Sequence, residues 1–319
     1  WAGLDALETV WPGCSPYVSR LNAAGYAHLE FDASGSGRLV WNDNVRIVAA
    51  EWNRQAPSSA PSDDAPGSLR RRLVEWYAQQ GRFNEAVELV SWAGAPDLVE
   101  WLATSHFVDL VSDGHSHGFS AFLPETETDA RARPATTVLA ALESHPLARD
   151  DQAVAHIVLA AIAELETRCA SENPDIACTA CLHTLVGLTV LDRWEQTEGL
   201  PERALWALAQ SQLPSTSGEE SARTYLLIGF LSLAGAQLRT ARVALSRAAA
   251  LARHDRDVFV ASAVGLHVLE GYFGQSLFDS SVDRDELMDE YRTPSEQGLG
   301  WWESVVLLAL AQTWGSLWR

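Results

Sequence analysis

A group of cysteines in the middle of the chain has the spacing of a metal or redox site. Cys178 and Cys181 form a Cys-x2-Cys pair, Cys169 precedes them and His183 follows them. Because thiolates and imidazoles bind zinc, and paired thiols exchange disulfides, these four side chains are candidates for either chemistry. The alternative is packing, since cysteine also serves as a small apolar residue between closely spaced helices. Without a second Cys-x2-Cys pair the packing interpretation is favoured, and we expect no metal, no cofactor and no catalytic residue.

Three histidines form a second candidate cluster. His115 and His117 stand in a His-x-His pair beside Asp113, and His106 lies a few residues earlier. Such a set can bind a metal, but a Gly-containing polar sequence is also typical of a turn between helices. No serine stands in a Gly-x-Ser-x-Gly sequence at a predicted strand-to-helix turn, which is the context of a hydrolase nucleophile. The turn interpretation is favoured, and we expect the chain not to be an enzyme.

The overall charge excludes several functions. The chain of 319 residues has 23 basic and 42 acidic residues, for a net charge of −19, and every basic residue is an arginine. Nucleic-acid binding needs a basic surface, so we expect this chain not to bind DNA or RNA directly. The absence of lysine also excludes a P-loop lysine and a Schiff-base lysine.

Cysteine usage and hydropathy bear on location. Four cysteines are too few for a disulfide scaffold in a chain of this length. Charged residues or histidines interrupt every apolar run before it reaches the length of a membrane span. We therefore expect a cytoplasmic protein without a membrane segment. The chain begins at Trp1 with no signal peptide, which leads us to expect part of a longer protein.

The first 56 residues differ in pattern from the rest. They predict a helix over 15–24, a hairpin of strands at 26–32 and 38–41, and a further helix over 45–52. This order is that of the later part of a winged helix. Its acidic residues outnumber its basic ones, so we interpret residues 1–56 as a spacer between domains. Residues 57–68 are rich in Pro, Ser and Asp and predict a linker.

From Leu69 to the C-terminus the apolar spacing is helical. Residues 125–133 are polar and predict a connector. Asn173 followed by Pro174 predicts a capped helix start. The predicted helices cover residues 69–80, 84–93, 96–103, 106–113, 118–123, 134–144, 149–170, 174–197, 201–212, 219–234, 237–253, 257–273, 283–291 and 299–317.

These helices follow one another in pairs, which indicates a repeat. The residues Tyr225, Ile228, Gly229, Ala241, Leu245 and Ala248 have the order of small and large side chains found in a tetratricopeptide repeat. Part of the same pattern recurs near Tyr77, Gly81, Ala86, Val90 and Ala93. We therefore expect a mainly α fold in which residues 69–319 form a right-handed superhelix of tetratricopeptide-like hairpins after a partial winged helix.

Several stretches resemble one family of regulators. Leu69–Leu89 resembles the first repeat of the sensor domain in the large LuxR-type ATP-dependent transcriptional regulators, the maltose-regulon activator family. Trp92–Leu98 is similar to that family's turn between repeats, and Ala130–Pro134 is similar to its Arg-Ala-Arg-Pro element. Ser19–Tyr26 with the hairpin looks like its winged helix. The resemblance covers about the first 160 residues.

The resemblance implies an effector-sensing and relay module. The family's nucleotide-binding loop and its C-terminal helix-turn-helix are both missing from this sequence, so the chain would control domains that it does not contain. Its partners would be a small-molecule effector or a regulatory protein, with homo-oligomers in the full-length regulator. The main alternative is a tetratricopeptide-like scaffold that binds a peptide or protein in its concave groove. An enzyme built on an α-solenoid is a third hypothesis.

The concave face of such a superhelix is formed mainly by the first helix of each pair. We therefore expect ligand-binding residues at Arg70, Arg71, Trp76, Tyr77 and Tyr225, because guanidinium groups suit an anionic or hydroxyl-rich effector. Tyr77 and Tyr225 also occupy packing positions of the repeat, which makes them candidates for the core. An acidic cluster predicts either a solvated helix face or a docking site for a basic surface. Its members are Asp279, Asp283, Asp285, Glu286, Asp289 and Glu290.

Overall fold

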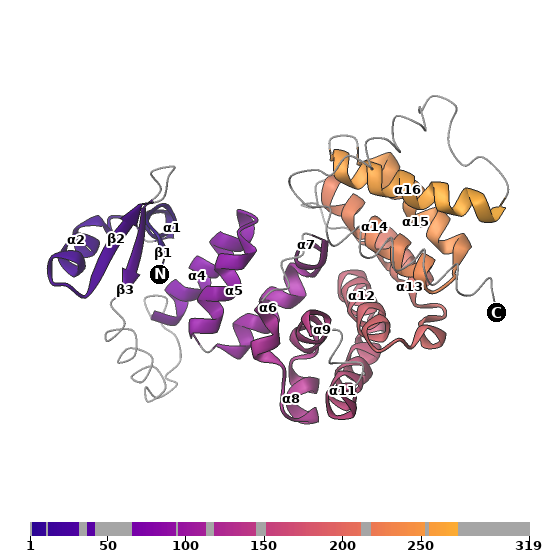
Figure 1. The fold of residues 1–319 in the computed structure, drawn as a ribbon, viewed down its shortest axis with the longest axis horizontal. Coiled ribbons are helices and arrows are strands. Elements are labelled where there is room, and N and C mark those ends of the chain that lie inside the picture. The colour runs from indigo at the N-terminus through magenta and orange to yellow at the C-terminus, as the bar shows by residue number, and fades with distance from the viewer. Residues whose placement is uncertain are drawn as a thin grey trace. The chain divides into compact units, whose positions relative to one another are not determined.

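The computed structural model shows a mainly helical chain with one small sheet, in two compact units (Figure 1). It describes residues 2–10, 12–31, 37–41, 66–93, 95–112, 118–144, 151–211, 218–252 and 255–273. The first unit runs from Trp1 to Leu102 and the second begins at Ala103. Several predictions lie outside the described residues: the helices at 45–52, 283–291 and 299–317, the acidic cluster, and the His115–His117 pair.

The first unit begins with a three-stranded antiparallel sheet. Its strand order is β1-β3-β2, and Leu39 of β3 pairs with both Ala2 and Leu29. The predicted helix and hairpin are confirmed, whereas β1 and α1 were not predicted. The two residues of β1 are too few to show a period. The elements are β1 (Ala2–Gly3), α1 (Leu4–Val10), α2 (Ser15–Ala23), β2 (Ala27–Phe31) and β3 (Gly37–Trp41).

Two further helices complete the hairpin that the sequence predicts near Tyr77. They are α4 (Pro66–Gln79) and α5 (Phe83–Ala93). The predicted linker extended to residue 68, but α4 begins at Pro66, since proline fits the first turn of a helix. Gly81 lies between the helices with φ +68°, a conformation that glycine adopts without strain. The same unit thus contains the sheet and the first predicted repeat helices.

The described part of the second unit is helical, and several of its helices are joined by short turns. It takes up the end of α6 and all the elements that follow, and most of the predicted helices are confirmed to within a few residues. They are α6 (Pro96–Ser105), α7 (Phe107–Ser112), η1 (Phe119–Phe122), α8 (Glu127–Ala132), α9 (Pro134–Glu143), α11 (Gln152–Cys169), α12 (Pro174–Val190), η2 (Trp194–Thr197), α13 (Leu200–Gln210), α14 (Gly218–Ala234), α15 (Leu238–Leu251) and α16 (Arg256–Phe273).

Three elements differ from the prediction. The expected connector at 125–133 contains α8, because the Thr126 hydroxyl caps its start by accepting from the amide of Asp129 at 3.1 Å. The expected single helix over 174–197 ends at Val190, and Asp192 with φ +58° turns the chain into the short 3-10 helix η2. The expected helix over 118–123 is a 3-10 turn.

The predicted cap at the start of α12 is confirmed. The side-chain oxygen of Asn173 accepts hydrogen bonds from the amides of Asp175 at 2.9 Å and Ile176 at 3.4 Å. These amides have no partner inside the helix, so the cap satisfies them and sets where α12 begins. Asp175 consequently lies in the first turn, close to the helix end.

Small residues let the hairpins of the second unit approach closely. A Cβ atom at Gly229 of α14 would lie 2.7 Å from the side chain of Leu245 on α15. Ile228, Ala241 and Ala248 on the same two helices are fully buried. Gly187 of α12 is similarly close to Ile162 of α11, at 3.1 Å. None of the described helices is both long and apolar enough to cross a membrane.

Candidate functional site

The predicted ligand residues of α4 are engaged in contacts within the first unit. The Arg71 guanidinium pairs with Glu75 one turn later at 2.8 Å. The Trp76 and Tyr77 rings meet edge to face with 5.2 Å between centroids, and Tyr77 is 1% exposed. The side chain of Arg70 lies outside the described part of the chain. Tyr225, on α14, is half-buried and belongs to the second unit.

Arg82, which the sequence analysis did not select, covers both aromatic rings. Its guanidinium carbon lies 5.0 Å from the Tyr77 ring centre and 6.0 Å from that of Trp76. The same guanidinium pairs with Glu85 at 2.8 Å and with Asp5 at 3.5 Å. The Tyr77 hydroxyl accepts from the Gly3 amide at 2.7 Å. These contacts hold α4 to α5 and to the start of the chain, which is a packing role.

The cysteines are buried and form no disulfide bond with one another. Cys14, Cys169, Cys178 and Cys181 are all free thiols in the interior. Burial raises the pKa of Cys178 to about 12, and the pKa of Cys181 is raised chiefly by its hydrogen bond with Cys169, with burial adding to it. The pKa of Cys169 is lowered, chiefly by the same hydrogen bond. Cys178 and Cys181 are therefore thiols rather than thiolates at neutral pH. Burial is what the packing interpretation expects.

The alternative metal set of three cysteines and His183 is not assembled. Both ring nitrogens of His183 face backbone oxygens, with Nδ1 2.7 Å from Thr179 and Nε2 3.2 Å from Ala103. Burial lowers the pKa of His183 to about 4, against the effect of these two carbonyl contacts. His106, from the other candidate cluster, lies 3.8 Å from the carboxylate of Asp109. Within the described ranges no three His, Cys, Asp or Glu side chains are placed to hold a metal ion.

His183 instead fixes a corner of the second unit. Ala103 lies in the last turn of α6, and its carbonyl oxygen is in polar contact with Nε2 of His183, which reaches it from α12. The ring of Phe107, at the start of α7, stacks on the imidazole with 3.7 Å between centroids. The α6–α7 corner is thereby held against α12.

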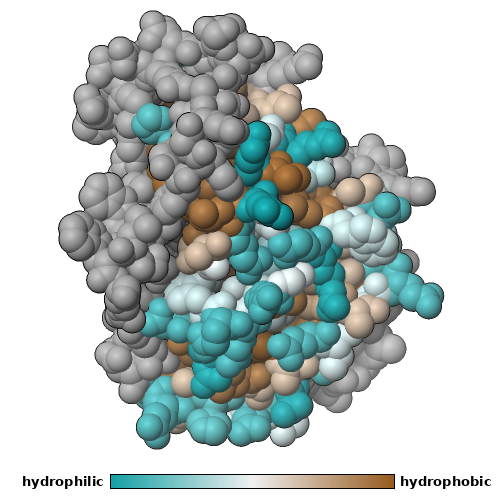
Figure 2. Space-filling model, turned by 90° about the vertical axis from the view of Figure 1, so that its right-hand side faces the viewer, coloured by the Kyte–Doolittle hydropathy of each residue, from teal (hydrophilic) through white to brown (hydrophobic). Residues whose placement is uncertain are grey.

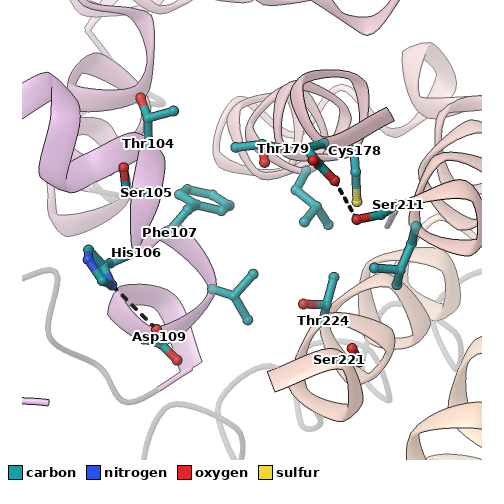
Figure 3. Close-up of a pocket in the computed structure, with 14 residues that line it drawn as sticks. Thr104, Ser105, His106, Phe107, Asp109, Cys178, Thr179, Ser211, Ser221 and Thr224 are labelled. Atoms are coloured by element: carbon teal, nitrogen blue, oxygen red, sulfur yellow. Dashed lines mark hydrogen bonds and ion pairs between the residues drawn. The ribbon is translucent and has the colours of Figure 1, made fainter. Parts of the chain in front are cut away.

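A cavity of about 150 Å³ lies beside this corner. Figure 3 shows Thr104, Ser105, His106, Phe107 and Asp109 on one side of it and residues of α12, α13 and α14 on the other. The cavity is formed entirely within the second unit. Its apolar wall consists of Phe107, Val108, Leu182 and Leu208 together with the thiol of Cys178.

The rest of the lining is polar and rich in hydroxyl groups. Hydroxyls both donate and accept hydrogen bonds, so this lining suits a small polar molecule. Among the described residues that line the cavity none is an arginine, and His106 is the basic side chain. The hydroxyl residues are Thr104, Ser105, Thr179, Ser211, Ser221 and Thr224, and the two carboxylates are Asp109 and Asp175.

The two carboxylates differ in their surroundings. Asp109 faces His106 and also lies 3.6 Å from the guanidinium of Arg223, which pairs in turn with Asp255 at 3.3 Å. Asp175 accepts a short hydrogen bond from the Ser211 hydroxyl and forms no ion pair in the described part of the chain. Among the described residues, the cavity therefore contains one carboxylate paired with a guanidinium group, Asp109, and one without such a partner, Asp175.

Sequence reasoning did not select this site. Asp175 looks like an ordinary first-turn acid, Ser211 like a surface residue at a helix end, and Thr224 like a polar residue inside the predicted helix over 219–234. The residues converge from positions as far apart as 104 and 224, which no local pattern records. No protein-family model matches the chain, and neither a curated protein nor a solved structure is detectably similar to it. Its function is therefore argued from this geometry.

Proposed function

We propose that the second unit senses a small polar effector in this cavity, and that the chain is the spacer-and-sensor region of a LuxR-type ATP-dependent regulator. The observation that carries the sensing role is the hydroxyl-lined cavity where the α6–α7 corner meets α12, α13 and α14. Its mixture of apolar wall and convergent polar groups is typical of small-molecule sites.

The architecture supports the assignment to a regulator of this type. The order β1, α1, α2, β2, β3 with sheet order β1-β3-β2 fits a winged helix. The close contacts at Gly187 and Gly229 fit stacked tetratricopeptide-like hairpins, for which we propose a right-handed superhelix. The resemblance over about the first 160 residues adds the family.

The proposed signal relay runs through helix α6. The chain leaves the first unit at Leu102 and enters the second at Ala103, inside the single helix α6. The cavity lining begins immediately afterwards, at Thr104. An effector that contacts Thr104 to Asp109 therefore contacts the segment that connects the two units, and its binding energy can favour one position of that segment.

A thermal-shift screen of small polar metabolites tests the sensing role. We expect at least one compound to raise the melting temperature. At a concentration of about 100 times its dissociation constant, such a compound should increase the unfolding free energy by roughly 2.7 kcal/mol. The variant Thr179→Phe places a large ring in the cavity and should lose this shift. Its control is Thr189→Phe, a change on the same helix away from the cavity, which should keep it. Equal shifts in both variants, or no stabilising compound, would contradict the proposal.

A different measurement tests the family. Coding sequence around this segment should contain a Gly-Lys-Ser/Thr loop upstream and a helix-turn-helix downstream. Their absence would leave the sensing role in place but remove the assignment to a LuxR-type regulator.

A second candidate function is a protein-binding scaffold, which the outer face of α15 favours. Arg239, Arg242, Val243 and Arg247 line an open hollow there, and Val243 is 54% exposed. Apolar side chains also reach the surface among hydrophilic ones on the face drawn in Figure 2. Binding of an acidic peptide that Arg242→Glu abolishes, with no small-molecule ligand found, would favour the scaffold.

A further inference from the structure

We propose that the effector is a small amine with hydroxyl groups, whose ammonium group binds Asp175. This inference rests on the proposed sensing role and adds the chemical class of the ligand. It follows from the unequal surroundings of the two cavity carboxylates.

Asp175 is the cavity carboxylate to which a cationic ligand group would bind most favourably. A carboxylate has about four positions for accepting hydrogen bonds. In Asp175 one of them is used by the Ser211 hydroxyl, which is the dashed line drawn at Ser211 in Figure 3. A ligand in the cavity displaces water from the remaining positions, which is unfavourable for a charged group unless an opposite charge replaces the water. An ammonium group provides that charge together with three donors.

The same lining disfavours an anion. Arg223 is the guanidinium near the cavity, and both Asp109 and Asp255 pair with it. A ligand carboxylate or phosphate would face Asp109 and Asp175 without an arginine of its own. A negatively charged ligand group would be repelled by these two carboxylates, and the repulsion is stronger in a partly buried site than in water.

The other residues that line the cavity indicate which groups the ligand has besides its ammonium group. The hydroxyls of Thr104, Ser105 and Thr179 can bind ligand hydroxyl groups from opposite sides, and Phe107 provides an apolar surface for carbon atoms. A volume of about 150 Å³ is that of a cavity known to accept benzene, so the ligand is a compact molecule of comparable size. These features together indicate an amino alcohol.

A matched pair of probes isolates the ammonium group. 2-Amino-1,3-propanediol and glycerol have the same carbon skeleton and differ by an ammonium group in place of the central hydroxyl. Calorimetric titration of the whole chain at pH 7 should show about tenfold tighter binding of the amine, because charge-assisted hydrogen bonds are roughly twice as strong as neutral ones.

Two variants locate the effect. Asp175→Asn keeps an acceptor for Ser211 but removes the charge, so the two probes should bind it equally. Asp257→Asn changes an exposed first-turn acid on α16 that does not line the cavity, and the tenfold preference should remain. A circular dichroism melt of each variant verifies that it is folded.

The outcomes separate this inference from the sensing role. Equal binding of both probes to the unaltered chain, or no binding of the amine at millimolar concentration, overturns the ammonium assignment. Retention of the amine preference in Asp175→Asn also overturns it. A neutral or anionic compound from the metabolite screen that Thr179→Phe excludes would do the same while leaving the sensing role intact.

Discussion

The imidazole of His183 stacks on the ring of Phe107, with 3.7 Å between their centroids. The two residues lie on α12 and α7, and Nε2 of the same imidazole lies 3.2 Å from the carbonyl oxygen of Ala103. One buried side chain thus joins the cavity wall at the α6–α7 corner to the helix that carries Asp175.

Replacing this side chain should destabilise the second unit. His183→Ala removes the stacked ring and leaves the Ala103 carbonyl without its partner, and losses of this kind typically amount to roughly 2–4 kcal/mol. Urea denaturation followed by circular dichroism measures the change. The control, His156→Ala, alters an exposed residue of α11 and should change the unfolding free energy by less than about 0.5 kcal/mol. Similar effects of the two changes would show that His183 does not fix the corner.

His183 should also make the unfolding free energy depend on pH. Its pKa is lowered by burial to about 4 in the folded chain, whereas an unfolded histidine titrates near 6.5. Between these values the unfolded state binds more protons, so stability falls as the pH is lowered through this window. From pH 7 to pH 5 this residue should contribute a loss on the order of 2 kcal/mol.

The comparison with His183→Asn separates this loss from the titration of the carboxylates. Asparagine does not titrate, so the variant should lose correspondingly less stability over the same interval in urea denaturation at both pH values. An equal change in unfolding free energy between the two pH values for the variant and the unaltered chain would mean that the pKa of His183 is not lowered.

The hydroxyl of Tyr77 on α4 should contribute to the stability of the first unit. Tyr77→Phe leaves the buried amide of Gly3 without an acceptor, and such a loss costs roughly 1–3 kcal/mol. Thermal unfolding should detect a lower melting temperature. Tyr26→Phe, at a tyrosine that is 53% exposed, provides the matched control and should have little effect. A harmless Tyr77→Phe would indicate that water replaces the hydroxyl.

The contact between Gly229 and Leu245 should appear as coupling between two substitutions. Gly229→Ala places a methyl group 2.7 Å from the Leu245 side chain, and overpacking of this kind costs roughly 1–3 kcal/mol. Leu245→Ala removes the obstructing atoms at its own cost in packing. The double variant should therefore be more stable than the sum of the two single effects predicts. Strict additivity in a double-mutant cycle would refute the close approach.

The buried thiols should be unreactive while the chain is folded. The pKa of Cys178 is raised to about 12 by burial, and all four cysteines are in the interior. Titration with Ellman's reagent at pH 8 should label none of them quickly, and all of them after addition of denaturant. Elemental analysis of protein purified without chelator should find no stoichiometric zinc. One metal per chain, lost on changing Cys178 and Cys181 to Ala, would restore the metal interpretation.

The sequence alone determined the helices and much of their packing. Apolar spacing and the Asn173 cap predicted α12 to begin at Pro174, and small residues predicted the contact of α14 with α15. These features are local, because a backbone hydrogen bond or a cap involves residues only a few positions apart. The pattern failed at α8 and η2, where one hydroxyl cap and one turn residue decide the structure against the surrounding periodicity.

Only the tertiary structure decided which polar residues share a site. Arg71 and Trp76 have the chemistry of ligand-binding residues, but Glu75 and Arg82 engage them within the first unit. Asp175 and Ser211 have no distinctive sequence context, yet they meet in the cavity with the α6–α7 corner. The physical reason is that helix periodicity reports which face of each segment is buried, whereas the meeting of particular side chains depends on contacts between helices far apart in the chain.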